Sequence, residues 1–132
     1  MNFRDKVVEF RGSCHIETNL SLVELANKVS IALCGGLSFT YGKHSIWEEI
    51  PSMYIENSIM GMFIIIGGYG GKEGFEIAIW PFGEFGRYLD ANNLNNKRVK
   101  INLDFHLYHL LKQGLSDYPE IKIIEPEVPP LA

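Results

Sequence analysis

The histidines and cysteines are the residues of this chain best suited to hold a metal ion or to act as nucleophiles. They are His15, His44, His106, His109, Cys14 and Cys34. A zinc site needs three or four ligands, commonly in closely spaced pairs such as Cys-x-x-Cys. Only His106 and His109 have a spacing that places two of these side chains on one side of a helix. Two ligands are too few, so the sequence predicts no metal site and no cofactor.

Two pairs of nearby residues could combine a base with an acid or a nucleophile. Cys14 and His15 are adjacent in a predicted strand, so their side chains should point to opposite faces of the sheet. Asp104 and His106 should lie about 160° apart around a predicted helix, because each residue turns it by about 100°. No Gly-x-Ser-x-Gly sequence is present to expose a serine nucleophile. We therefore predict that the chain is not an enzyme, with a site assembled from distant residues as the open alternative.

A glycine-rich segment at residues 67–72 superficially resembles a phosphate-binding loop. Such a loop requires a lysine followed by serine or threonine at the start of a helix. Here Lys72 is followed by Glu73, and the residues beyond alternate as in a strand. The segment is therefore predicted to be the turn of a β-hairpin.

Acidic residues are concentrated in the middle of the chain. The whole chain has a net charge of −4, but residues 48–96 alone have a net charge of −5. The acidic residues of this segment are Glu48, Glu49, Glu56, Glu73, Glu76, Glu84 and Asp90. Such a segment is either a solvated face of a sheet or a surface for a basic partner. The negative net charge argues against direct binding to nucleic acid.

Aromatic residues accompany these acidic residues. Tyr69 falls in the glycine-rich turn, Trp80 shares a predicted strand face with Glu76, and Phe85 lies in a loop. Aromatic residues and arginine are enriched at the energetic centres of protein interfaces. We therefore predict a partner-binding surface, although Trp80 and Phe85 could instead be core residues beneath the second helix. The predicted binding residues are Glu49, Glu56, Tyr69, Glu73, Glu76, Trp80, Glu84, Phe85, Arg87, Tyr88 and Asp90.

Length and composition predict one globular domain spanning residues 1–132. The chain is 46% hydrophobic and 21% charged, which is typical of a domain with its own core. No run approaches the roughly 18 apolar residues of a membrane helix, and the first residues are charged rather than apolar. We expect a cytoplasmic protein without membrane contact. In that compartment Cys14 and Cys34 should be free and buried, with a single disulfide as the alternative.

Two helices are predicted from capping signals and apolar spacing. The first begins after Ser21, which has capping-box spacing to Glu24, and ends at the glycine pair 35–36. The second spans residues 104–113 and is also followed by a glycine. The inward stripe of the first helix comprises Leu22, Leu25, Ala26, Val29 and Leu33.

Alternating and apolar segments elsewhere predict strands. They cover residues 6–18, 37–41, 45–50, 53–57, 60–66, 73–82 and 120–125, whereas residues 83–98 are predicted to be an ordered loop. The strand at 60–66 is apolar on both faces and should lie centrally under a helix layer. Consecutive strands with helices near both ends predict an α+β fold. We expect a mainly antiparallel sheet of about five to seven strands, with two principal helices packed on it as a single layer.

The order of segments along the chain resembles that of a known family. The helical run 20–29 leads into residues 37–41, followed by Glu48-Glu49-Ile50-Pro51, Tyr54-Ile55-Glu56 and a closing helix and strand through Ile121-Lys122-Ile123. Over about residues 18–125 this organisation resembles the immunity proteins of bacterial contact-dependent growth inhibition (CDI) systems, including those paired with RNase-like toxin domains. The resemblance carries no catalytic motif and assigns no binding residue to a position here. It implies a cytoplasmic inhibitor of a nuclease toxin delivered by a neighbouring bacterium.

The acidic middle of the chain is compatible with that implication. Nucleases grip phosphates in basic clefts, which an acidic protein can occupy, and opposite potentials speed association. We therefore predict that the chain neutralises a cognate toxin domain with a basic active-site cleft, by stoichiometric binding and occlusion. The alternative is a cytosolic protein-binding adaptor or small-ligand-binding domain with no toxin partner.

Overall fold

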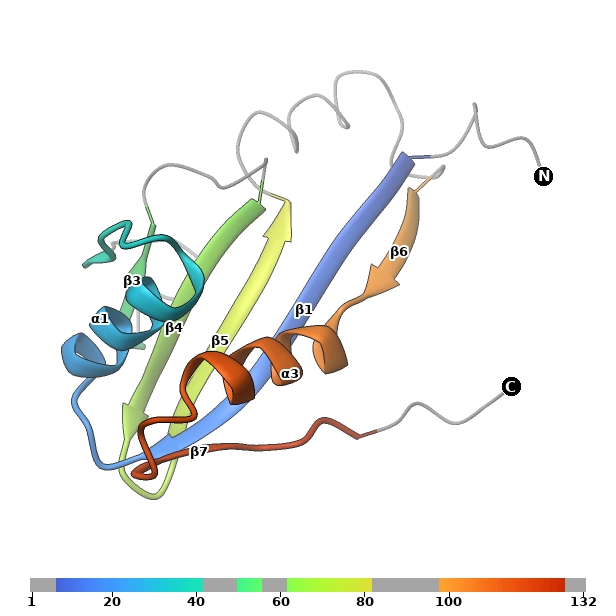
Figure 1. Cartoon of the computed structure of the whole chain (residues 1–132). Helices are drawn as coiled ribbons and strands as arrows, with labels where there is room; N and C mark the ends of the chain where they lie inside the picture. Colours follow the sequence, from blue (N-terminus) through green and yellow to red (C-terminus); the bar gives the residue numbers. More distant parts are fainter. Residues whose placement is uncertain (1–6, 42–49, 56–61, 82–97, 128–132) are drawn as a thin grey trace.

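The computed structural model describes residues 7–41, 50–55, 62–81 and 98–127. In this part of the chain seven strands form one sheet in the order β2-β3-β4-β5-β1-β6, and β7 also pairs with β1. Every pairing is antiparallel except that of β1 with β6. The two helices, α1 and α3, lie on one face of the sheet (Figure 1). The fold is therefore α+β with a mainly antiparallel sheet and one helix layer, as predicted.

The long first strand organises the sheet. β1 (Val7–Thr18) pairs along one edge with β5 (Gly74–Pro81). Its other edge is shared end to end by two shorter strands, β6 (Arg98–Asn102) and β7 (Ile121–Ile123). β6 runs parallel beside the first half of β1, and β7 runs antiparallel beside its last residues. Between these two strands the chain crosses the sheet as α3 (Asp104–Gly114).

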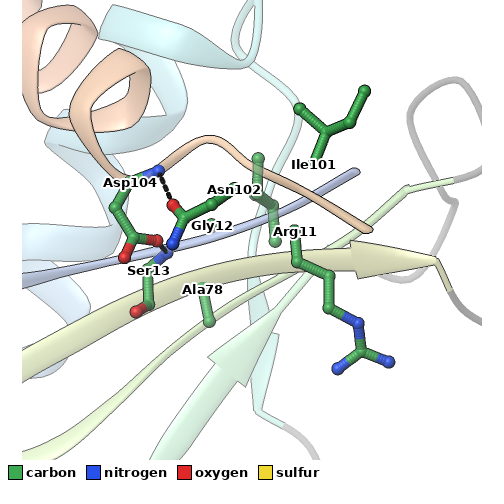
Figure 2. A pocket seen from close by; sticks show the side chains of 8 residues that line it. Arg11, Gly12, Ser13, Ala78, Ile101, Asn102 and Asp104 are labelled. Atoms are coloured by element: carbon green, nitrogen blue, oxygen red, sulfur yellow. Dashed lines mark hydrogen bonds between the residues drawn. The ribbon is translucent and has the colours of Figure 1, made fainter. Parts of the chain in front are cut away.

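The carboxylate of Asp104 spans the gap between β6 and β7. The chain leaves the sheet at Leu103, whose N–H donates to the Arg11 carbonyl at 2.7 Å. Asp104 Oδ1 then accepts the backbone N–H of Ser13 at 2.8 Å (Figure 2). The side-chain oxygen of Asn102 accepts the N–H of Asp104 at 2.7 Å. The Ser13 N–H points to this edge, where neither strand reaches it, so the carboxylate satisfies a backbone donor that would otherwise lack a partner.

The first helix begins at a capping box, as predicted. α1 (Leu22–Leu33) follows Ser21, whose hydroxyl accepts the Glu24 N–H at 3.2 Å. The Glu24 carboxylate in turn accepts the Ser21 N–H at 3.2 Å. These hydrogen bonds hold the pKa of Glu24 below its usual value, and they satisfy donors that the first turn leaves without helical partners. Gly35 and Gly36, at φ +60° and +85°, follow the helix end.

The main core lies between the helices and the sheet. Its most deeply buried side chains come from both helices and from β1, β4 and β5. They are Ile16, Leu25, Ala26, Val29, Ile66, Ile77 and Leu111, each at most 1% exposed. Cys14 and Cys34 belong to the same cluster, and both are free and buried, as predicted.

The face of the sheet that points away from the helices has a second, smaller buried cluster. Phe63 and Ile65 of β4 (Met62–Gly70) and Ala78 of β5 form it, and Tyr54 packs against them. The rings of Tyr54 and Phe63 have centroids 5.5 Å apart. These residues alternate with those that face the helices. β4 is therefore buried on both faces, which explains its continuous apolar sequence.

The sequence analysis missed one strand. β6 begins at the last residue of the segment 83–98 predicted to be a loop, and residues 99–102 belong to no predicted element, because five residues of mixed polarity carry little strand signal of their own. It is a strand because it pairs with β1, about ninety residues earlier in the chain. β2 (Thr40–Tyr41) and β3 (Ser52–Tyr54) are shorter than predicted. The strand predicted at 45–50 lies almost wholly outside the described residues.

Candidate partner-binding site

The turn between β4 and β5 brings three of the predicted binding residues together. Tyr69 is near the end of β4, Glu73 lies in the turn, and Glu76 lies in β5. All three line a hollow of about 360 Å³, which we call the hairpin hollow. The rest of its lining consists of His15, Ile50, Gly67, Gly68, Gly74 and Phe75. This arrangement makes the hairpin hollow the candidate binding site.

Glycines line the hairpin hollow where side chains would not fit. Gly68 has φ +139°, and a Cβ there would lie 2.5 Å from the Gly74 carbonyl oxygen. Gly74 has φ +68°, and a Cβ there would lie 2.6 Å from the Ile16 carbonyl oxygen and 2.8 Å from His15 Nε2. Both positions therefore require glycine, because the backbone conformation and these close approaches exclude larger residues. The glycine-rich segment is thus a hairpin turn, as predicted.

Strand register aligns four residues on the face of the sheet that points away from the helices. Ser52 pairs with Gly67, Gly67 with Glu76, and Glu76 with His15. Directly opposed residues on antiparallel strands carry their side chains on the same face. Gly67 therefore stands between Ser52 and Glu76 on this face of the sheet. Ser52 is 4% exposed, and its hydroxyl has no hydrogen-bond partner among the described residues.

The hairpin hollow is acidic and partly apolar. Glu73 and Glu76 are exposed, and neither forms an ion pair with another described residue. Tyr69 is 63% exposed and Ile50 is 40% exposed. Carboxylates beside an exposed aromatic ring can bind a positively charged group. The chemistry of the site therefore suits a cationic ligand.

The thiol on the helix-facing side of β1 stays protonated. Burial is the main cause that raises the pKa of Cys14 to about 11, and the carboxylates of Asp104 and Glu76 contribute to the rise. Cys14 Sγ lies 3.5 Å from the Ile124 carbonyl oxygen, in the geometry of a weak hydrogen bond. Burial also raises the pKa of Cys34. Because a reactive cysteine needs a lowered pKa, neither thiol is activated as a nucleophile.

A second hollow lies where β6 leads into α3 (Figure 2). It has a volume of about 350 Å³ and is lined by Arg11, Gly12, Ser13, Ala78, Ile79, Ile101, Asn102 and Asp104. The Arg11 guanidinium extends away from Asn102 and Asp104, so the polar groups do not converge on one point. The oxygens of Asn102 and Asp104 already accept backbone N–H groups of the chain. The side chains of Asn102 and Asp104 therefore have a structural role at the edge of β1 that pairs with β6 and β7.

Only part of the predicted binding surface falls within the described residues. The structure brings Tyr69, Glu73 and Glu76 together. Trp80 lies in β5, where its backbone pairs with Phe63 of β4. The other predicted binding residues lie outside the described ranges; they are Glu49, Glu56, Glu84, Phe85, Arg87, Tyr88 and Asp90.

Several residues in or beside the hairpin hollow were not among the predicted binding residues. His15 and Ile50 line the hollow, and Ser52 stands next to Gly67 in the sheet. Alternation along β1 indicates that the His15 side chain points away from that of Cys14. Alternation does not show which strand lies next to His15 in the sheet. Only the pairing of His15 with Glu76 places its side chain at this site.

Two absences concern metal binding and membranes. No group of three or more His, Cys, Asp and Glu side chains that could hold a metal ion occurs among the described residues. Across those same ranges, no helix is long and apolar enough to cross a membrane.

Comparisons with protein-family models, with curated proteins and with solved structures found no match for this chain. A functional proposal therefore depends on the residues of the chain, on their geometry and on the resemblance in segment order.

Proposed function

We propose that this protein is an immunity protein that neutralises a cognate toxin, a nuclease delivered by a neighbouring bacterium. It acts in the cytoplasm by binding the toxin and covering its active site, without contacting nucleic acid itself. The observation that carries the proposal is the hairpin hollow. There Tyr69, Glu73 and Glu76 present two carboxylates and an exposed ring on one glycine-constrained turn.

Electrostatics supports such a partnership. A nuclease must bind phosphates, so the toxin domain is expected to have a basic active-site cleft. The net charge of −5 in residues 48–96 favours association with that cleft. Complementary potentials mainly raise the association rate, which matters for an inhibitor of a lethal enzyme.

The proposal is tested first with the natural partner. An immunity gene is expected directly after a large toxin gene, so the product of the upstream neighbour is the protein to examine. We expect the two purified proteins to form a 1:1 complex, the toxin domain to lose nuclease activity in it, and co-expression to restore growth. A protein that neither binds the toxin domain nor protects cells from it would contradict the proposal.

The site is tested separately with variants of the hairpin hollow. We expect Tyr69→Ala and Glu76→Gln each to weaken toxin binding about tenfold, equivalent to about 1.4 kcal/mol. Asp117→Asn is the control, because Asp117 is exposed in the turn after α3, in the helix layer on the other side of the sheet. Thermal unfolding of each variant checks that the fold is retained. If the combined variant binds the toxin as tightly as the wild type, the interface lies elsewhere.

A further inference from the structure

We propose that the free edge of β7 is a docking site for an extended acidic segment of another protein, which adds to the sheet as one more strand. This surface shares no residue with the hairpin hollow, and the inference does not depend on the proposed function. Three observations support it: the backbone groups at this edge, a stripe of α3 beside it, and the charge of the residues around it.

The backbone of β7 has hydrogen-bonding groups that no neighbouring strand uses. β7 pairs with β1 on one side, and among the described residues no strand lies on its other side (Figure 1). The Ile124 N–H donates to the His15 carbonyl at 2.9 Å, so it points toward β1. Backbone groups alternate in direction along a strand, so the N–H and C=O of Ile123 point away from β1. An extended chain beside β7 would pair with both groups.

A groove follows this edge. A hollow of about 550 Å³, which we call the β7 groove, is lined by all three residues of β7 and by residues of α3 and the turn after it. Tyr108, Lys112 and Leu115 line it from the helix layer, and their spacing of four and three residues places them on one side of a helix. Domains that bind peptides by strand addition likewise combine main-chain hydrogen bonds at a sheet edge with pockets for alternate side chains.

The β7 groove is basic, unlike the chain as a whole. Its lining includes Lys112 and Lys122 and no carboxylate, although the chain has a net charge of −4. The Lys112 ammonium lies 5.4 Å from the centroid of the Tyr108 ring, and neither lysine forms an ion pair with another described residue. Lys122 stands opposite Glu17 in the register with β1, so Lys112 is the more available of the two. This charge complements an acidic partner.

The chemistry of the edge favours a peptide over a nucleic acid or a free phosphate. Ile123 presents one donor and one acceptor, which a peptide backbone matches with its own C=O and N–H. Phosphate oxygens only accept hydrogen bonds, so they would leave the Ile123 carbonyl without a partner. Tyr108 and Leu115 also offer apolar surface to the side chains that alternate with the acidic ones in an extended chain.

The test is a titration of the whole protein with an acetylated and amidated hexapeptide in which valine alternates with glutamate, followed by amide chemical shifts at constant ionic strength. We expect saturable shifts centred on residues 108–123 and slower hydrogen exchange at the Ile123 amide, with a dissociation constant on the order of 1 mM. The peptide with glutamine in place of glutamate should bind about fivefold more weakly, and the peptide with lysine should cause no saturable shift. No saturable shift with the glutamate peptide, or equal affinities for all three, would overturn the inference.

Methylation of the peptide backbone tests strand addition directly. Successive N–H groups of an added strand point alternately toward and away from β7. N-methylation of all the valines and N-methylation of all the glutamates should therefore differ: one peptide should bind about tenfold more weakly than the parent, and the other should bind like the parent. Equal effects of the two methylations would overturn strand addition. Displacement of the peptide by an equal concentration of inorganic phosphate would also overturn it, because it would indicate a simple anion site.

Two matched variants locate the peptide on the protein. Lys112→Gln should weaken binding of the glutamate peptide about threefold, because it removes the cation beside the β7 groove. Lys72→Gln is the control, because Lys72 is exposed in the turn between β4 and β5 and does not line the groove. Thermal unfolding checks that both variants keep the fold. If Lys112→Gln and Lys72→Gln bound the peptide equally well, the β7 groove would not be its site.

Discussion

Single side chains in this protein owe their chemistry to the face of β1 on which they lie. Cys14 faces the core, where burial and two nearby carboxylates favour the neutral thiol. His15, the next residue, belongs to the opposite face, where it lines the hairpin hollow beside Glu76. The alternation of a strand thus separates a thiol and an imidazole that are adjacent in the sequence.

The raised pKa of Cys14 predicts a loss of stability at high pH. The pKa rises from 9.0 in the unfolded reference to about 11 in the fold, so the native state holds this proton more tightly. The resulting stabilisation is fully present below pH 9.0 and is lost as the pH rises through about 11. The free energy of unfolding, measured with urea between these pH values, should therefore fall less steeply with pH in Cys14→Ala than in the wild type. If the free energy of unfolding fell equally with pH in the two proteins, the Cys14 thiol would not contribute to the pH dependence of stability.

The β4–β5 hairpin is the element that builds the candidate site. Its glycines allow the turn to fold against β1, and the register across β3, β4, β5 and β1 then aligns Ser52, Gly67, Glu76 and His15. A change in this turn should alter both stability and binding, because the same backbone positions set the shape of the hollow.

Alanine at two glycines of this hairpin should separate backbone strain from steric clash. Gly71 has φ +57°, and a Cβ added there would meet open space, so Gly71→Ala should destabilise the fold by only about 1 kcal/mol. Gly74→Ala places a methyl group against the Ile16 carbonyl oxygen and the His15 ring. It should therefore cost about 3 kcal/mol or more. Denaturant unfolding measures the loss of stability in each variant. If the two variants lost equal stability, β1 would not approach Gly74 closely.

At the scale of the whole molecule, the fold depends on contacts between distant parts of the chain. β1 pairs with strands that begin at residues 74, 98 and 121. β6 and β7 leave a gap along one edge of β1. In that gap the Asp104 carboxylate accepts the hydrogen bond of the Ser13 N–H. One carboxylate thereby connects the start of α3 to the central strand.

This connection predicts how two substitutions of Asp104 should differ. Asp104→Ala removes the acceptor of the Ser13 N–H and should destabilise the fold by about 1–3 kcal/mol. Asp104→Asn retains a side-chain oxygen and should cost less. Hydrogen exchange at the Ser13 amide is the direct measurement: protection should be lost in the alanine variant and largely kept in the asparagine variant. Unchanged protection in Asp104→Ala would contradict the role assigned to this carboxylate.

Much of the fold follows from local signals that the sequence contains. The capping box at Ser21 and Glu24 and the glycines after Leu33 define α1 without tertiary information. The apolar composition of residues 60–66 predicts a strand buried on both faces, because no polar side chain there needs water. Lys72 followed by Glu73 excludes a phosphate-binding loop and predicts the hairpin.

The tertiary structure alone decided which of these elements meet. The sequence of β6 has weak strand propensity, and it becomes a strand only by pairing with β1. Alternation shows that Glu76 and His15 each lie on one side of their strands, but register across the sheet determines that they are neighbours. The hairpin hollow has the same origin, since its lining comes from β1, from the segment before β3, and from both strands of the hairpin. Such contacts join residues far apart in the chain, and local side-chain patterns do not specify their partners.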